Sequence, residues 1–198
     1  MSSAAISPGT IETPWALPYR GQVGMFCLIV AESSIFTIFV VAYLFYIGKS
    51  PSGPTPREIL EIPIFATICL LSSSITIHTA VRALGKGNFG TFRLLWFGTL
   101  VLGAIFLIAT GFEWQHLIVD RNFTIATNLF GTTYYSLVGL HASHVTVGLV
   151  GLLTVMLLAL FGKVRQEHYP QVDTFALYWH FVDAVWVVVF TVVYIIGR

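Results

Sequence analysis

Charged residues are scarce in this sequence of 198 residues and make up only 10% of it. In a water-soluble chain about a quarter of the residues are charged, so the composition excludes a soluble globular domain. The formal net charge of +1 and the lack of a basic run or stripe argue against nucleic acid or an acidic substrate as a partner. Because 56% of the residues are hydrophobic and the mean hydropathy is +0.83, we predict an integral membrane protein.

Cysteine is nearly absent as well, with only Cys27 and Cys69, and both lie inside apolar stretches. No CxxC or Cys/His zinc pattern is present, so we predict neither a disulfide framework nor a zinc site. The N-terminus lacks an early basic cluster followed by a short apolar core, which argues against a cleaved signal peptide. We interpret residues 1–21 as a cytoplasmic tail that leads to a single membrane domain, residues 22–198.

Apolar runs of about 20 residues are long enough to cross a membrane as helices. The sequence contains such runs at residues 22–47, 62–84, 92–112, 132–161 and 174–196. The stretches between them are GKSPSGPTPREILE, the short turn GKGN, HLIVDRNFTIATN and GKVRQEHYPQVD, which carry the glycine, proline and polar residues typical of loops. We therefore predict an all-α fold, a polytopic membrane protein built as a bundle of five transmembrane helices.

Basic residues near the ends of the spans predict the orientation, because cytoplasmic loops carry an excess of Lys and Arg. The side that holds the N-terminus carries the larger set: Arg20, Arg82, Lys86, Arg93, Lys163 and Arg165. The opposite side carries the smaller set: Lys49, Arg57, Arg121 and Arg198. This bias predicts a cytoplasmic N-terminus and a C-terminus outside.

A few ionisable side chains interrupt the apolar spans, where charge is costly. Glu32 stands alone in CLIVAESSIFTIFVVAYLFYI, and at about 1.5 Å of rise per residue it lies roughly 15 Å along its span. By the same measure Asp183 lies about 14 Å along the last span, which enters from the same side. His141 and His144 fall near the middle of the fourth span. These depths are compatible with a buried polar cluster, whose candidate members are His141, His144, His180, Asp183 and Glu113.

The spacing of these residues leaves three interpretations open. His141 and His144, and likewise His180 and Asp183, are three residues apart and share a helix face. In the simplest interpretation Asp183 accepts the N–H of His180, so that each polar group is satisfied where water is absent. In the second, the intramembrane Asp, Glu and His side chains form a proton relay. In the third, the histidines join a carboxylate at a metal or haem site.

Two glutamates have alternatives of their own. Glu32 is either hydrogen-bonded to Ser33, Ser34 or a neighbouring helix, or it is a proton-holding group. Glu113 follows a charge-free run beside Trp114, and it is either an anchor at the outer membrane interface or a partner for a histidine.

Several motifs occur in a fixed order along the chain: AESSIFTIF, LLSSSITIHTAVRALGKGN, GFEWQHL, GLHASHVTVGL and YWHFVDAVWVVVFTVVY. The series resembles subunit III of the haem-copper terminal oxidases, cytochrome c oxidase in particular, in its short five-helix bacterial form. The buried carboxylate of that family matches Glu32, and the histidines of its HxxH motif match His141 and His144. Its WHFVD motif matches residues 179–183.

The resemblance implies a non-catalytic subunit that holds no metal of its own. Haem and copper are expected in the partner subunits, subunit I is the direct partner, and subunit II and a small subunit IV complete the complex. The enzyme reduces dioxygen to water and pumps protons, and subunit III stabilises subunit I and supports proton uptake. The implied location is the inner membrane of a bacterial cell.

The resemblance also implies bound phospholipid, which the family holds in a cleft between helix groups. Many members have seven helices, whereas this chain lacks the first two of them. Lys163 and Arg165 are candidates for contact with lipid head groups on electrostatic grounds alone.

Other functions remain open at this stage. GPTPREILEIP and HLIV resemble the quinol-oxidase branch of the family, while Glu32 and Tyr178 are more similar to the cytochrome c branch. A stand-alone proton-coupled transporter is a second alternative, although the sequence shows no repeated halves or broken helices. A metal- or haem-binding membrane protein is a third.

Overall fold

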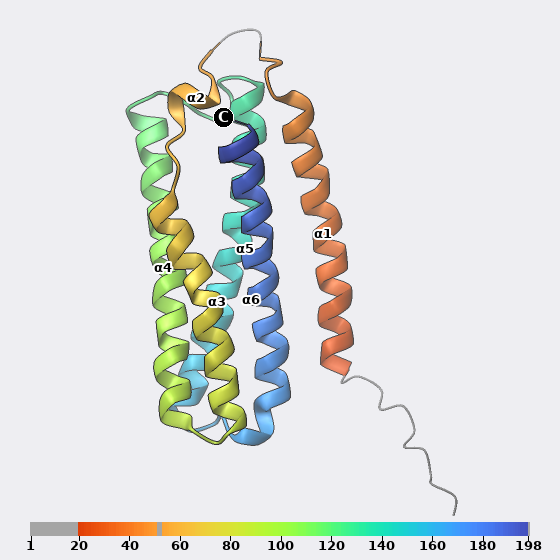
Figure 1. The fold of residues 1–198 in the computed structure, drawn as a ribbon, viewed down its shortest axis with the longest axis vertical. Coiled ribbons are helices and arrows are strands. Elements are labelled where there is room, and N and C mark those ends of the chain that lie inside the picture. Colours follow the sequence, from red (N-terminus) through yellow and green to blue (C-terminus); the bar gives the residue numbers. More distant parts are fainter. Residues whose placement is uncertain (1–19, 51–52, 198) are drawn as a thin grey trace, which may run out of the picture.

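The computed structural model describes residues 20–50 and 53–197, and Figure 1 shows long helices that run up and down along one axis. Within these described residues, five helices are long and apolar enough to cross a membrane: α1 (Arg20–Tyr46), α3 (Ile64–Gly85), α4 (Phe89–Val119), α5 (Leu129–Leu160) and a last one spanning Gln166–Ile196. The last consists of a 3₁₀ turn η1 (Gln166–His168), α6 (Tyr169–Phe190) and π-helical turns η2 (Thr191–Ile196). The predicted all-α, five-helix membrane bundle is confirmed. The predicted tail, residues 1–21, lies outside the described residues apart from the start of α1.

Helices α4 and α5 begin where the sequence changes from turn residues to an apolar run. Asn88 caps α4 by accepting a hydrogen bond from the backbone N–H of Thr91, and Asn128 caps α5 in the same way with Gly131. Between α1 and α3 the chain forms a short helix, α2 (Pro56–Ile59), within the predicted loop. The caps matter because the first backbone N–H groups of a helix have no partner inside it.

The third span is longer than predicted, since α4 continues past residue 112 to Val119. The sequence suggested an end at Phe112 because Glu113 is ionisable. In the folded chain tyrosines from two other helices donate hydrogen bonds to that carboxylate, so the helix continues through it. It ends at Asp120, shortly before Asn122 takes a positive φ of 51°.

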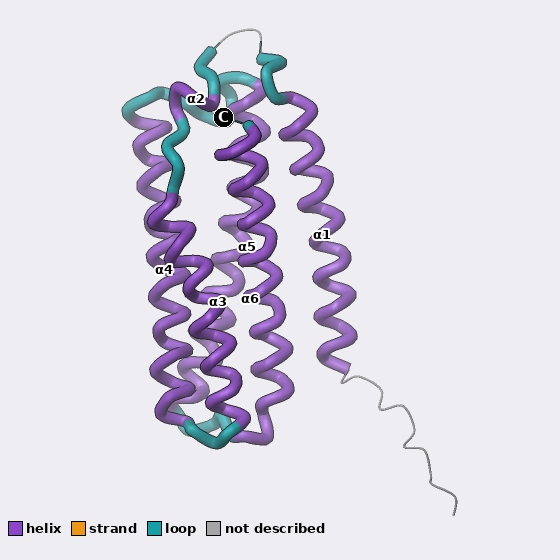
Figure 2. The backbone as a smooth tube through the Cα atoms, viewed as in Figure 1, coloured by secondary structure: helices purple, strands orange, loops and turns teal. Residues whose placement is uncertain are grey.

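Helices α3 to α6 form the compact part of the bundle, and α1 stands beside it (Figure 2). α1 packs against α5 and α6, and only Phe36 and Tyr43 of its side chains are buried. The first described residue of α1 lies at the end of the bundle opposite the C-terminus, as an odd number of spans requires (Figure 1).

Tryptophans fill the centre of the bundle and tie its helices together. Each of three buried indoles donates a hydrogen bond to another helix: Trp96 to the Leu152 carbonyl at 2.9 Å, Trp179 to Ser73 Oγ at 2.8 Å, and Trp186 to Thr67 Oγ1 at 3.2 Å.

The Trp179 ring fits only because two glycines face it. A Cβ atom at Gly103 on α4 or at Gly148 on α5 would lie 2.8 Å from a ring carbon of Trp179. Real Cβ atoms do not approach so closely, so the helices reach their present separation because these positions carry no side chain.

Candidate functional site

The carboxylate of Glu32 on α1 meets the imidazole of His144 on α5, with 3.1 Å between Oε2 and Nε2. Both side chains are partly buried, with 24% of Glu32 and 14% of His144 exposed. The other ring nitrogen of His144, Nδ1, lies 2.8 Å from the Leu140 carbonyl oxygen. A carbonyl oxygen can only accept, so Nδ1 carries a proton. The tertiary fold therefore joins two residues that the sequence offered as separate candidates.

The hydrogen bond between Glu32 and His144 requires a second proton, in addition to the one on His144 Nδ1. Since Nδ1 already donates, a neutral imidazole can only accept at Nε2. The hydrogen bond then exists either with a protonated Glu32 that donates to Nε2, or with an imidazolium that donates to the carboxylate. In both forms the pair holds one exchangeable proton between two helices.

This pair lies beside a cavity of about 220 Å³. The cavity is lined by residues from α1, α5 and α6: Leu28, Glu32, Ser143, His144, Val147 and Tyr178. Tyr178 also donates a hydrogen bond to the backbone carbonyl of His144, at 3.2 Å, and so fixes α6 against this part of α5. The shared proton is thus accessible from the α1 side of the bundle.

His141 shares a helix with His144 but has different surroundings. Its side chain is fully buried, and neither ring nitrogen has a hydrogen-bond partner among the described residues. The Trp186 indole stacks on it at 4.9 Å between ring centroids, and Phe106 meets it edge-on at 5.8 Å. The i, i+3 spacing places both histidines near one face of α5. His141 nevertheless packs in the aromatic core, whereas His144 faces α1.

The predicted hydrogen bond between His180 and Asp183 is wrong. His180 Nδ1 lies 2.6 Å from Ser74 Oγ on α3. Asp183 is buried, and neither of its carboxylate oxygens has a partner at hydrogen-bonding distance among the described residues. The reason is that α3 presents a hydroxyl to His180, and such a contact cannot be inferred from the spacing within α6.

Glu113 has tyrosine partners, and the predicted histidine partner is wrong. Its Oε1 accepts hydrogen bonds from Tyr194 at 3.1 Å and from Tyr134 at 3.3 Å. These residues come from η2 and α5, so the carboxylate joins three helices in the half of the bundle that holds the C-terminus. The tyrosine hydroxyls themselves lie 3.5 Å apart.

The candidate polar residues therefore do not form one cluster. They divide into Glu32 with His144, His180 with Ser74, Glu113 with two tyrosines, and the unpartnered His141 and Asp183. Within residues 20–50 and 53–197, no three His, Cys, Asp or Glu side chains come together as a metal site.

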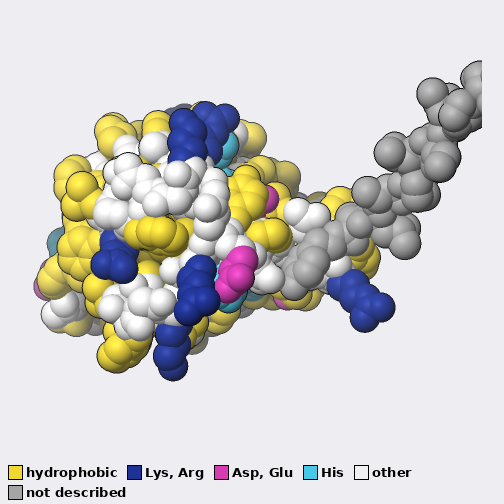
Figure 3. Space-filling model, turned by 90° about the horizontal axis from the view of Figure 1, so that it is seen from below, with side chains coloured by type: hydrophobic (Ala, Val, Ile, Leu, Met, Phe, Trp, Pro, Cys, Tyr) yellow, Lys and Arg dark blue, Asp and Glu magenta, His cyan; other side chains and the backbone are white. Residues whose placement is uncertain are grey.

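Lys163 and Arg165 lie in the connection between α5 and α6, and both are exposed. Arg165 Nη1 is 3.9 Å from a carboxylate oxygen of Glu167. Figure 3 shows this end of the bundle, over which Lys and Arg side chains are spread. A role in contact with lipid head groups stays a prediction.

Sequence reasoning missed Ser74, Tyr134 and Tyr194 as partners of the ionisable groups. A signal was available for Ser74, because it is one helical turn before His78 in a run of serines within an apolar span. No comparable signal pointed to the tyrosines, since tyrosine is common in membrane helices near the interface.

Five apolar helices with ionisable side chains held between them define a polytopic membrane protein. The sequence of residues 19–198 matches the family described as cytochrome c oxidase subunit III. Cytochrome c oxidase subunit 3 of Alkalihalophilus pseudofirmus is 34% identical over 96% of this chain and 98% of its own length. The protein of the same name from Bacillus sp. strain PS3 is 35% identical over 95% of both chains. Cytochrome bo(3) ubiquinol oxidase subunit 3 of Pseudomonas aeruginosa is 31% identical over 88% of this chain and 84% of its own.

The chain therefore belongs to the cytochrome c oxidase subunit III family, and the predicted family is confirmed.

Proposed function

We propose that this chain is the non-catalytic subunit III of a proton-pumping respiratory oxidase that takes electrons from cytochrome c. Its task is to stabilise subunit I during turnover and to support proton uptake. The observation that carries the proposal is the Glu32–His144 contact, which holds one exchangeable proton on the α1 side of the bundle beside a cavity.

The proton role follows from the position of this pair. A charged group inside hydrocarbon is costly, and such groups mark proton paths or helix contacts. Glu32 and His144 can exchange which of them holds the proton without leaving a bare charge, because the proton stays within the hydrogen bond. If the pair passes this proton to a neighbouring subunit, a carboxylate is left behind, so the pair must take up another proton to return to its starting state.

The partners follow from the family rather than from this chain. Subunit I is the direct partner, subunit II and a small subunit IV complete the complex, and haem and copper are held by partner subunits. The proposed location is the inner membrane of a bacterial cell, with the N-terminus in the cytoplasm. In support of this orientation, Lys86, Lys163 and Arg165 lie at the end of the bundle from which α1 starts.

A quinol oxidase is the second candidate complex. It is favoured by the Pseudomonas aeruginosa relative, whose name refers to ubiquinol. The two candidates share every role assigned to this chain and differ in the electron donor to the complex.

The test is to purify the complex through an affinity tag on this chain from aerobically grown cells. We expect haem absorbance that changes on reduction, subunit I among the co-purified proteins, and oxygen consumption with reduced cytochrome c as donor. Oxygen consumption with quinol alone identifies the second candidate. If the tagged chain carries neither haem absorbance nor subunit I, the proposal fails.

A further inference from the structure

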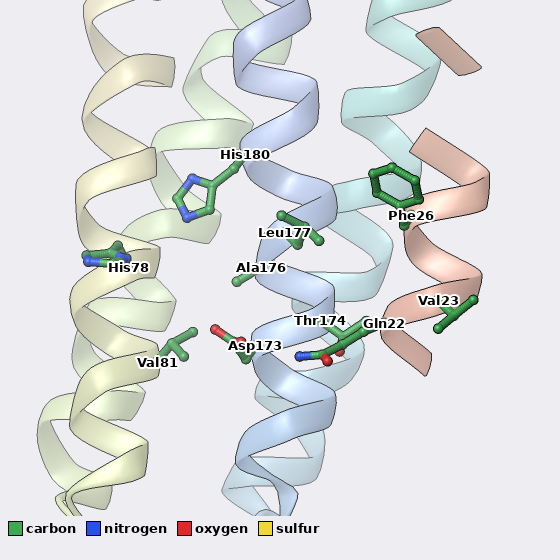
Figure 4. Close-up of a pocket in the computed structure, with 10 residues that line it drawn as sticks. All are labelled: Gln22, Val23, Phe26, His78, Val81, Asp173, Thr174, Ala176, Leu177 and His180. Atoms are coloured by element: carbon green, nitrogen blue, oxygen red, sulfur yellow. The ribbon is translucent and has the colours of Figure 1, made fainter. Parts of the chain in front are cut away.

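A larger cavity lies on the other side of α1, between α1, α3 and α6 (Figure 4). Its volume is about 440 Å³, and small-molecule sites typically measure about 300–1,000 Å³. Its walls are mainly apolar, and the apolar residues that line it are Val23, Phe26, Val81, Ala176 and Leu177. His78 and Leu177 are also exposed on the outer surface of the bundle, so the cavity is open to the surrounding lipid.

Polar side chains from α1, α3 and α6 also line this space, namely Gln22, His78, Asp173, Thr174 and His180. The rings of His78 and His180 lie 6.2 Å apart between centroids, on the α3 side of the cavity (Figure 4). Asp173 lies about two turns below His180 on α6 and lines the same cavity (Figure 4). His180 uses Nδ1 for Ser74. Its Nε2, both nitrogens of His78 and the Asp173 carboxylate make no hydrogen bond to another described residue.

His78 and His180 need a hydrogen-bonding partner when the chain is in a membrane, whereas Asp173 lies near the start of α6 at the end of the span. Lipid tails offer no hydrogen bonds, and an unsatisfied polar group in hydrocarbon costs several kcal/mol. The occupant must therefore both donate and accept hydrogen bonds at its head, and its remainder must be apolar.

The charges of the cavity select an uncharged head. Among the residues that the structure describes, no Lys or Arg lines it, and Asp173 is its one carboxylate. Arg82 and Lys86 line a separate hollow at the end of the helices, with Glu167 and Tyr169. A phosphate inside the cavity between α1, α3 and α6 would face a carboxylate without a cation beside it, and like charges repel. An aromatic head fits the rings of Phe26, His78 and His180.

We propose that this cavity binds an isoprenoid quinol. One hydroxyl of the head contacts the two imidazoles, the other donates to Asp173, the ring packs against Phe26, and the isoprenoid tail leaves toward the lipid past Leu177. The step is reversible binding, with no electron transfer in this chain. The site is independent of whether cytochrome c or quinol supplies electrons to the complex.

The test uses native membranes that contain the tagged full-length chain. The probe is a ubiquinone analogue that carries a photoreactive azide on its tail, reduced to the quinol before illumination. The chain is then purified under denaturing conditions and its labelled peptides are identified by mass spectrometry. Because no intact oxidase is recovered, the result does not depend on the complex described above.

We expect labelling of peptides that contain Val23 to Phe26 or Leu177, and loss of the label when unlabelled quinol is added. Leu177→Trp fills the cavity and should abolish this label, whereas Leu157→Trp, at a position of similar exposure on α5, should leave it unchanged. His78→Leu removes a hydrogen-bonding group from an exposed position and should weaken competition by unlabelled quinol about tenfold, the effect of roughly one hydrogen bond.

Three results would overturn the proposal. The first is labelling that is absent or is the same in all variants. The second is stronger labelling of the same peptides by diacylglycerol or phosphatidylglycerol that carries the same photoreactive tail, which would identify a lipid groove. The third is crosslinking of the wild-type cavity residues to another protein in place of the probe. If the Leu177→Trp protein does not accumulate, the test rests on His78→Leu, and unchanged competition by unlabelled quinol in that variant would overturn the proposal.

Discussion

His144 Nε2 lies 3.1 Å from the Glu32 carboxylate, and among the described residues this is the hydrogen bond that joins α1 to another helix. The remaining contacts of α1 with the bundle are packing contacts, centred on Phe36 and Tyr43. The same pair thus attaches α1 and holds an exchangeable proton, and substitutions can separate these roles.

Glu32→Gln should preserve the attachment and remove the proton function, because an amide N–H can donate to Nε2 but does not release its proton. We expect normal assembly with reduced proton pumping or a shorter active lifetime. Glu32→Leu should in addition lower the stability of the complex by about 1 kcal/mol, the usual scale of an interhelical hydrogen bond in a membrane. Pumping and turnover lifetime are measured in vesicles containing the purified complex.

Ser34→Ala is the control for these variants, since Ser34 is exposed on α1 and bonds only to the carbonyl of Val30 in its own helix. It should behave as the wild type. Unchanged pumping and unchanged lifetime in Glu32→Gln would show that Glu32 is only a helix contact.

Gly148→Ala should destabilise the bundle, because the added Cβ would lie 2.8 Å from the Trp179 ring. Overpacking of a tight core costs about 1–3 kcal/mol. The melting temperature of the detergent-solubilised protein measures the effect.

Gly111→Ala on α4 is the matched control, since a Cβ there meets nothing within 4 Å. It should be neutral or stabilise the protein by up to about 1 kcal/mol, because alanine is the better helix former. Equal melting temperatures for the two alanine variants would contradict the close fit of Trp179.

Tyr134→Phe and Tyr194→Phe should be coupled, because both hydroxyls donate to one carboxylate oxygen of Glu113. Each single change leaves one donor and should cost about 1 kcal/mol. The double change leaves Glu113 with neither donor, so its cost should exceed the sum of the two by about 0.5–3 kcal/mol. Melting of the single and double variants measures the coupling.

Glu113→Leu on the double-phenylalanine background should restore part of the lost stability, since it removes the carboxylate that lacks donors. Tyr46→Phe, at an exposed tyrosine of α1, should have no effect. Purely additive costs would show that the two tyrosines do not act on Glu113 together.

Asp183→Leu should leave the stability of the protein unchanged or raise it. The carboxylate is buried and has no partner at hydrogen-bonding distance within residues 20–50 and 53–197, and an unpaired buried polar group is destabilising. By contrast, Ser73→Ala should cost about 1–3 kcal/mol because it leaves the Trp179 N–H without its acceptor. A marked loss of stability in Asp183→Leu would mean that Asp183 has a partner, for example in another subunit of the complex.

The spans could be predicted closely because membrane insertion depends on local hydropathy and helix length. The predicted span at 62–84 corresponds to α3 at Ile64–Gly85, and the one at 132–161 to α5 at Leu129–Leu160. The prediction failed at Glu113, where hydropathy indicated an end to the span. Hydropathy scores each carboxylate without its partners. The tyrosines that donate hydrogen bonds to Glu113 are 21 and 81 residues away along the chain, so a local score does not include them.

Spacing within a helix was a weaker guide to contacts. It correctly placed His180 and Asp183 on neighbouring positions of α6, but His180 bonds to Ser74, which is 106 residues away along the chain. The spacing of His141 and His144 similarly suggested a common role, while the packing of α1 and of Trp186 gives them different surroundings.

The sequence alone determined that the chain crosses a membrane five times, that a few ionisable side chains lie inside the spans, and which family it resembles. Those properties depend on the order of residues along each helix. Only the tertiary structure decided that Glu32 meets His144, that Glu113 meets two tyrosines and that His180 turns to Ser74. Membrane helices are apolar on nearly every face, so hydropathy does not indicate their rotation, which is set by close packing such as that of Trp179 against Gly103 and Gly148.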